Sequence, residues 1–311
     1  MSPFIVPATL PRTARVGLVL AAVTAAISGV SVFINGLIVT SFPDPVALAA
    51  VRNGLVGLAI VAWLGLPSLV AELRALDGRR RTGLVVLGIL GGGVPFILFF
   101  SGLGATGGAG AAVLQKSMFL WVALLAVPLL GERVGMLQIA ALGALAVGSL
   151  LAGPMPATGI GMATALVLVA TWLWAGEVVL ARRLLAGVSV RLAAAARMTI
   201  GAGVIVAWLV LNGRGAAITS FGATQWPLIA LTGLLLFGYV TTWYGALART
   251  TATNVSSILV GGAVVTAALT AIRVGTVPAA PVVTGLVLIV TGSAVVWLAG
   301  RRSAAGTEPG A

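Results

Sequence analysis

The sequence has no cysteine, no histidine and a single lysine among its 311 residues. Without cysteine the chain cannot form disulfides or thiolate metal sites, and without histidine it lacks the commonest metal ligand and the usual catalytic base. Only six acidic residues are present, and none form the paired aspartates of an aspartyl active site. These absences argue against an enzyme, and we predict no catalytic residues, no metal site and no cofactor.

Charged residues of both signs are also scarce. They make up 8% of the chain, against 60% hydrophobic residues and a mean hydropathy of +1.17, whereas soluble domains carry about 25% charged residues. The composition therefore predicts a membrane protein that crosses the bilayer several times. Its basic excess, 18 against 6, falls almost entirely between apolar segments. We therefore expect the lipid bilayer, and no nucleic acid, as the partner of these charges.

Apolar windows of about 20 residues, long enough to cross a bilayer as a helix, recur along the chain. We predict an all-α protein with ten transmembrane helices, at residues 17–39, 45–66, 83–103, 108–130, 135–152, 159–181, 190–211, 227–248, 252–272 and 280–299. The first window is too long for the apolar part of a signal peptide. The two longer connections, residues 67–82 and 212–225, leave no room for a soluble domain.

The arginines concentrate on alternate connections. With the N-terminus in the cytoplasm, the inner segments hold thirteen arginines and the outer segments two, Arg214 and Arg273. Because inner loops of membrane proteins are rich in Lys and Arg, we expect a multi-pass protein of the cytoplasmic membrane with both termini in the cytoplasm. The three remaining basic residues, Arg52, Lys116 and Arg197, fall inside predicted helices.

A weak internal repeat has a separation of 145 residues. Residues 60–64 (IVAWL) recur at 205–209, and the run AAVR that ends at Arg52 recurs as AAAR ending at Arg197. Five predicted helices, an odd number, separate the copies, so the second copy must cross the membrane in the opposite direction. Inverted repeats are typical of alternating-access transporters, whose substrate sites lie near the middle of the membrane where the repeats meet.

Several short segments are similar to one family of membrane proteins. They are residues 44–52, residues 114–134 with Gly131-Glu132-Arg133, the helix around Gly143, Trp174-Ala175, Arg182-Arg183, the run leading to Arg197, residues 244–247 and residues 252–255. Together they resemble the EamA family of the drug/metabolite transporter superfamily. The resemblance implies two inverted EamA repeats of five helices, residues 1–155 and 156–311, and the transport of small metabolites by alternating access.

Lys116 is the first candidate site residue, since an ionised lysine at the centre of a membrane helix costs about 3 kcal/mol unless it is paired, hydrated or functional. We place it about 12 Å from the outer end of its helix, with Arg52 at a similar depth. Two cations at one depth predict a water-filled chamber that binds a carboxylate or phosphate. A packing or snorkelling role for Arg52 is an equal alternative. At the register of Lys116 the second half has Gly261.

Glu177 and Arg197 form a second candidate pair. We place both about 10 Å from the inner face, on neighbouring helices. A structural ion pair is the simpler interpretation, because pairing removes the cost of either charge alone. The alternative is a gate, or a coupling site in which Glu177 exchanges a proton.

Polar and aromatic residues complete the predicted substrate site. Aromatic rings and a few polar groups line cavities for organic molecules, although ordinary packing would also explain them. Besides the two cations, the candidates are Gln115, Trp121, Trp172, Tyr244 and Asn254.

The sequence as a whole predicts a secondary transporter (permease or exporter) for a small anionic or zwitterionic metabolite, such as an amino acid. A lipid flippase and a structural membrane protein are the alternatives. A serine–lysine hydrolase using Ser117 and Lys116 is disfavoured, because adjacent residues on a helix do not face each other.

Overall fold

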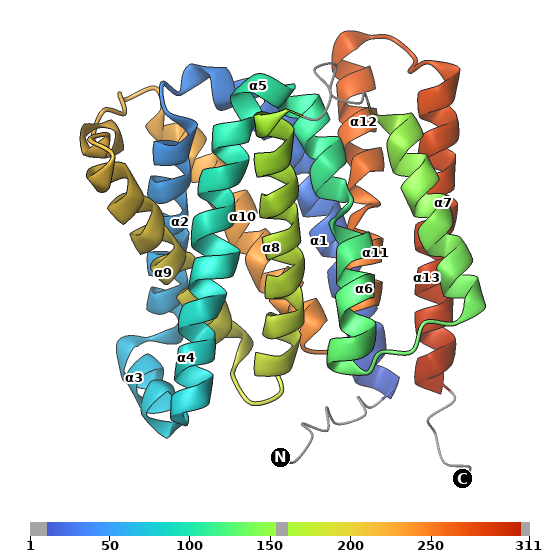
Figure 1. The fold of residues 1–311 in the computed structure, drawn as a ribbon, viewed down its shortest axis with the longest axis horizontal. Helices are drawn as coiled ribbons and strands as arrows, with labels where there is room; N and C mark the ends of the chain where they lie inside the picture. The colour runs from blue at the N-terminus through green and yellow to red at the C-terminus, as the bar shows by residue number, and fades with distance from the viewer. Residues whose placement is uncertain (1–10, 154–160, 306–311) are drawn as a thin grey trace.

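The computed structural model describes residues 11–153 and 161–305, which are almost entirely helical and contain no strand (Figure 1). Nine helices in these ranges are long and apolar enough to cross a membrane, and one shorter apolar helix accompanies them. The prediction of an all-α polytopic membrane protein is therefore confirmed. The boundary expected between residues 155 and 156 lies outside the described residues.

The first half contains five spans and one helix that is too short to cross a membrane. The first two spans are α1 (Pro11–Ile38), followed by the 3₁₀ turn η1 (Val39–Ser41), and α2 (Pro45–Leu64). After the short α3 (Leu66–Ala75), the third span combines α4 (Gly78–Leu87), the π-helical segment η2 (Gly88–Gly93) and the start of α5 (Val94–Lys116). The fourth span ends in α6 (Met118–Leu130), and the fifth is α7 (Met136–Ala152).

The second half follows the same order. Its first two spans are α8 (Met162–Leu184) and α9 (Val190–Leu211), followed by the 3₁₀ turn η3 (Gly215–Ile218). The later spans are α10 (Trp226–Leu247), the pair α11 (Ala252–Leu259) and α12 (Gly262–Val274), and α13 (Ala280–Ala305).

Two local features differ from the expected boundaries. The connection at residues 67–82 holds most of α3 and the first turn of α4, because Leu69 and Leu73 recur at helical spacing and pack against the core. The backbone of α5 is helical through residues 104–107, where we expected a gap between spans. The helix instead ends at Lys116, where the Ser117 hydroxyl donates a hydrogen bond of 2.6 Å to the carbonyl of Leu114.

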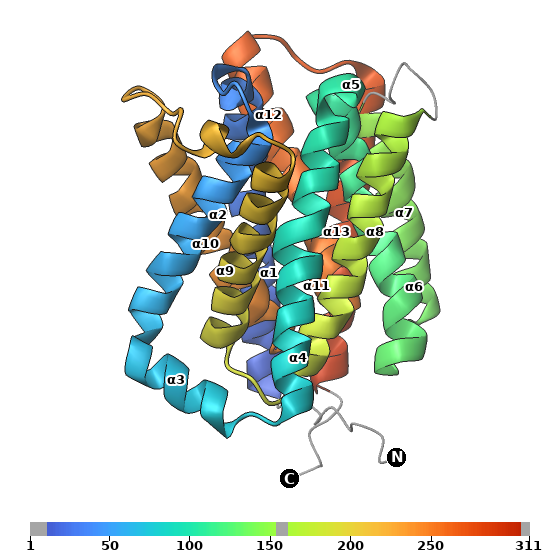
Figure 2. The same ribbon diagram turned by 60° about the vertical axis from the view of Figure 1, so that its left-hand side comes forward.

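The helices pack in pairs that repeat between the halves (Figures 1 and 2). α8 is contacted by α5 and α6. In the same way, α1 is contacted by the corresponding helices of the other half, α10 and α12. Between the halves, α2 packs against α9 and α7 packs against α13. α2 and α9 run in opposite directions, since the guanidinium of Arg191, near the start of α9, lies 5.2 Å from the ring centre of Trp63, near the end of α2. The contacts that α1 and α2 make in the first half thus recur at α8 and α9 in the second, with α2 and α9 antiparallel.

Glycines at these contacts let the helices approach closely. A side-chain carbon at Gly148 on α7 would lie 2.7 Å from the carbonyl oxygen of Gly285 on α13. One at Gly29 on α1 would lie 2.4 Å from the carbonyl oxygen of Gly262 on α12. Small residues at such contacts are typical of helix packing in membranes, where van der Waals contact replaces the hydrophobic effect as the driving force.

Candidate functional site

Glu177, Arg197 and Tyr244 meet in the interior, on α8, α9 and α10 respectively. Arg197 Nε lies 3.6 Å from Glu177 Oε1, and the Tyr244 hydroxyl donates a hydrogen bond to the same carboxylate oxygen. The three residues are 2%, 5% and 0% exposed. The pairing offsets part of the large cost of burying each charge alone. We refer to these three residues as the buried charge cluster.

The glycine run of η2 packs directly against the buried charge cluster. A side-chain carbon at Gly91 would lie 2.7 Å from Glu177 Cγ, and one at Gly92 would lie 1.9 Å from the carbonyl oxygen of Arg197. The Gly91 carbonyl accepts a 3.0 Å hydrogen bond from the indole of Trp174, one turn before Glu177 on α8. Glycine is therefore required here by the close approach of η2 to the ion pair, and π-helical turns of this kind recur at functional sites.

Part of Arg197 has no hydrogen-bond partner. Its Nε and Nη1 are buried and form no hydrogen bond within the described residues, the contact of Nε with Glu177 being an ion pair only. Close by, the Asn53 amide donates a 3.4 Å hydrogen bond to the Gly92 carbonyl, while its own Oδ1 is buried without a donor. Buried polar groups normally have partners, so this region has capacity for water or a polar ligand.

Lys116 ends α5 at the point where the fourth span breaks. Lys116 and Gln115 are both half-buried, and neither side chain forms a hydrogen bond or ion pair with the residues that the structure describes. The second half breaks at the equivalent place, since α11 ends at Leu259, α12 starts at Gly262, and Gly261 lies 145 residues after Lys116. The helix is thus interrupted at equivalent positions in the two halves, with Lys116 at the break in the first half and Gly261 at the break in the second.

Arg52 occupies the register of Arg197 in the first half but has a different partner. It is buried on α2, and its Nη1 donates a 3.4 Å hydrogen bond to Asn35 Oδ1 on α1. Its Nε is buried without a hydrogen bond among the described residues. The repeat therefore places an arginine at equivalent positions of α2 and α9, with a neutral amide as the partner in one half and a carboxylate in the other.

The remaining predicted substrate-site residues lie in separate surroundings. Tyr244 belongs to the buried charge cluster. Asn254 is buried on α11 and accepts a 3.2 Å hydrogen bond from Gln138 on α7. Trp121 and Trp172 are 36% and 52% exposed, on α6 and α8. No hydrogen bond among the described residues joins these four residues to Lys116.

Comparison with known proteins gives a family match for the first half. Residues 15–153 match the EamA-like transporter family. A solved structure, described only as the crystal structure of a protein, is similar in fold, with a TM-score of 0.66, 18% sequence identity, and coverage of 94% of this chain and 97% of that chain. No curated protein matches the chain.

This match, together with the apolar helices, indicates a multi-pass membrane protein of the EamA transporter type. The matched residues include the whole first half that the structure describes from residue 15, with Arg52, Gln115 and Lys116.

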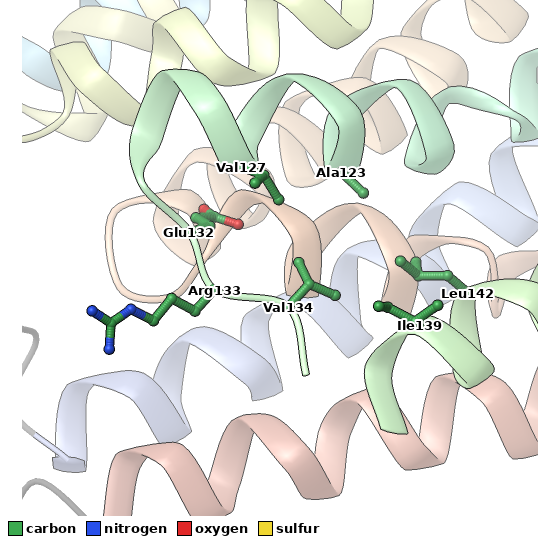
Figure 3. A pocket seen from close by; sticks show the side chains of 7 residues that line it. All are labelled: Ala123, Val127, Glu132, Arg133, Val134, Ile139 and Leu142. Atoms are coloured by element: carbon green, nitrogen blue, oxygen red, sulfur yellow. The ribbon is translucent and has the colours of Figure 1, made fainter. Parts of the chain in front are cut away.

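Two cavities of the protein lie near its arginine-rich end. One, of about 520 Å³, opens between α6 and α7 and is mostly apolar (Figure 3). Glu132 is the acidic residue that lines this cavity. Its carboxylate already accepts hydrogen bonds of 2.6 and 3.1 Å from the backbone N–H groups of Ala252 and Thr253 at the start of α11. Arg133 points away from this cavity in Figure 3. The second cavity, of about 470 Å³, lies among α2, α3, α4 and α9, and Lys116 lines neither of the two.

Three acidic residues that were not predicted as site residues join different parts of the protein. Glu132 caps α11, Asp44 binds Arg214 at 2.6 Å, and Glu72 accepts two hydrogen bonds from Ser189, both of 2.8 Å. Asp44 and Ser189 each precede a predicted helix and lie 145 residues apart, so the repeat contained a signal for both as N-caps. No sequence pattern indicated the partners.

Proposed function

We propose that this protein is a secondary transporter that moves a small anionic or zwitterionic metabolite, such as an amino acid, across the cytoplasmic membrane by alternating access. The observation that carries the proposal is Lys116, a half-buried cation at a break in a membrane span, with no partner among the described residues. Such a cation costs about 3 kcal/mol at the centre of a membrane helix. An anionic group of a substrate would compensate that cost.

Further donors of the first half support the same class of substrate. Gln115 adjoins Lys116 and its amide has no described partner, and the free Nε of Arg52 is a second cationic donor. Broken helices near the middle of the membrane are a usual place for transporter substrates. In this proposal Trp121, Trp172 and Asn254 contribute to the wall of the site in the state that opens to substrate.

The buried charge cluster serves in this proposal as the gate and coupling site. Glu177 is the one carboxylate that pairs with Arg197 among the described residues, so protonation of Glu177 would release Arg197 from its ionic partner. Tyr244, on α10, donates a hydrogen bond to the same carboxylate oxygen that Arg197 faces. Because the three residues come from three spans, a change in the charge of Glu177 would alter the packing of α8, α9 and α10 together.

The test is transport by the full chain reconstituted in proteoliposomes. A panel of radiolabelled amino acids, dicarboxylates and sugar phosphates is offered together with neutral and cationic solutes, and uptake is measured by filtration. We expect uptake of at least one anionic or zwitterionic solute, reduced at least tenfold by Lys116→Met and less by Lys116→Arg. Arg133→Met is the matched control, because it removes an exposed cation outside the spans.

Three results would contradict the proposal. Uptake restricted to neutral or cationic solutes would exclude anion recognition, and normal uptake by Lys116→Met would exclude its role. Scrambling of a fluorescent phospholipid without solute uptake would favour a flippase instead. For the coupling role, we expect Glu177→Gln to lose uptake driven by a pH gradient while keeping exchange of labelled for unlabelled solute.

A further inference from the structure

The second cavity has an apolar wall and a basic rim. Its wall includes Val61 on α2, Leu84 and Val85 on α4, and Ile200 on α9, and its rim carries Arg74 and Arg81. Thr199, the most polar residue of the wall, donates its hydroxyl hydrogen to the carbonyl of Ala195 at 2.7 Å. The wall is therefore apolar, and the hydroxyl of Thr199 already donates its hydrogen bond within α9.

α3 lies across the end of the bundle below α2 and α9, where it borders this cavity (Figure 2). Leu69 and Leu73 pack towards the core, whereas Leu66 and Val70 are exposed. A short amphipathic helix beside a membrane span is suited to the boundary between acyl chains and headgroups. A cavity that α3 borders would, in a bilayer, adjoin the headgroups and the first part of the acyl chains.

Arg74 and Arg81 of the rim form no ion pair with an acid among the described residues. The two nearby acids have other partners. Glu72 accepts hydrogen bonds from the backbone N–H and the hydroxyl of Ser189. Asp77 accepts a hydrogen bond from the backbone N–H of Arg80 and forms an ion pair with its guanidinium. Arg81 is held in place by α3, since its Nε and Nη2 donate to the carbonyls of Leu73 and Arg74, both at 3.0 Å. The exposed guanidinium of Arg74 has no hydrogen bond or ion pair among the described residues.

We propose that this cavity binds an anionic phospholipid of the adjoining leaflet, with its phosphate at Arg74 and Arg81 and one acyl chain along the wall formed by α2, α4 and α9. Guanidinium groups match the geometry of phosphate oxygens. The arginine-rich end of a membrane protein faces the cytoplasmic leaflet, which carries anionic lipid. A lipid in this position would join α3 and α4 of the first half to α9 of the second. This site is separate from Lys116, and the inference does not depend on the proposed substrate.

The experiment is native mass spectrometry of the full chain in detergent, titrated with phosphatidylglycerol or phosphatidylcholine of the same acyl chains. We expect the chain to bind phosphatidylglycerol at least tenfold more tightly, with Arg74→Gln removing most of this preference and Arg74→Lys part of it. Arg133→Gln, an equal loss of charge at the same end of the protein, is expected to leave the preference unchanged. Val85→Trp, which fills the wall without changing charge, should weaken both lipids at least fivefold.

Several outcomes would overturn the inference. Equal losses for Arg74→Gln and Arg133→Gln would mean general surface attraction, and equal binding of the two lipids would mean that no headgroup site exists. Unchanged lipid binding by Val85→Trp would show that the acyl chain lies elsewhere. Displacement of the lipid by millimolar glycerol 3-phosphate, with no effect of acyl-chain length, would assign the rim to a soluble phosphate compound.

Discussion

Asp44 and Ser189 cap α2 and α9 at opposite ends of the bundle, and each is bound by the segment that follows the other helix. Asp44 accepts the N–H groups of Val46 and Ala47 and pairs with Arg214, which comes after α9. The Ser189 hydroxyl accepts the N–H of Leu192 and donates to Glu72 on α3, which comes after α2. The α2–α9 pair is therefore tied at both ends, so a rocking motion between the halves must either preserve this pair or break one tie.

The two ties should differ in strength. Glu72→Gln removes a part-buried, charge-assisted interaction with a helix N-cap, and we expect it to lower the free energy of unfolding by about 1–2 kcal/mol. Arg214→Gln should cost less than about 1 kcal/mol, because its side chain is 42% exposed. Thermal unfolding in detergent measures both, with the exposed Arg273→Gln as the control. An equal or larger effect of Arg214→Gln would contradict this ranking.

A methyl group at Gly92 should be far more harmful than one at an open glycine of the same protein. Gly92→Ala would place its new carbon 1.9 Å from the carbonyl oxygen of Arg197, whereas nothing lies within 4 Å of such a carbon at Gly143. Overpacking typically costs about 1–3 kcal/mol, and a backbone clash costs more. We expect Gly92→Ala to reduce the yield of folded protein or its melting temperature, and Gly143→Ala to leave both unchanged. Similar melting temperatures for the two variants would refute the close approach of η2 to α9.

Removing both members of the Glu177–Arg197 ion pair should destabilise the protein less than the sum of the two single losses. Glu177→Gln leaves the buried Arg197 without a counter-charge, which typically costs about 3–5 kcal/mol. The double variant Glu177→Gln/Arg197→Gln should be more stable than the sum of the two single losses predicts. Tyr244→Phe, which removes one hydrogen bond, should cost about 1 kcal/mol. Denaturant unfolding of the four variants measures the coupling, and strictly additive losses would mean that the pair contributes no interaction energy.

The absence of cysteine makes the orientation directly measurable. Ala75→Cys at the end of α3 and Ser220→Cys after η3 introduce single thiols at exposed positions on opposite ends of the bundle. With inner loops rich in arginine, an impermeant maleimide applied to intact cells should label Cys at 220 and should reach Cys at 75 only after lysis. The reverse pattern would invert the proposed orientation, and labelling of both in intact cells would rule out a single orientation.

Much of the architecture was predictable, because apolar windows and arginine-rich connections are properties of the chain itself. The start of α2 at residue 45 was also predicted, and the structure shows Asp44 as its N-cap, followed by Pro45 in the first turn. The helical connection between residues 104 and 107 was not, because its glycines are compatible with either a loop or a helix. The pairing of Glu177 with Arg197 was expected, but the participation of Tyr244 was not, because 67 residues separate Tyr244 from Glu177.

The sequence by itself determined the all-helical fold and the membrane-protein class, since both follow from the order and spacing of residue types along the chain. Only the tertiary structure decided which groups face one another: Glu72 with Ser189, Gly91 with the Glu177–Arg197 pair, and Arg74 with an open apolar cavity. Helix packing rotates each span about its axis and slides it along its neighbours. A difference of one residue turns a side chain by about 100°, so periodic patterns alone do not specify these contacts.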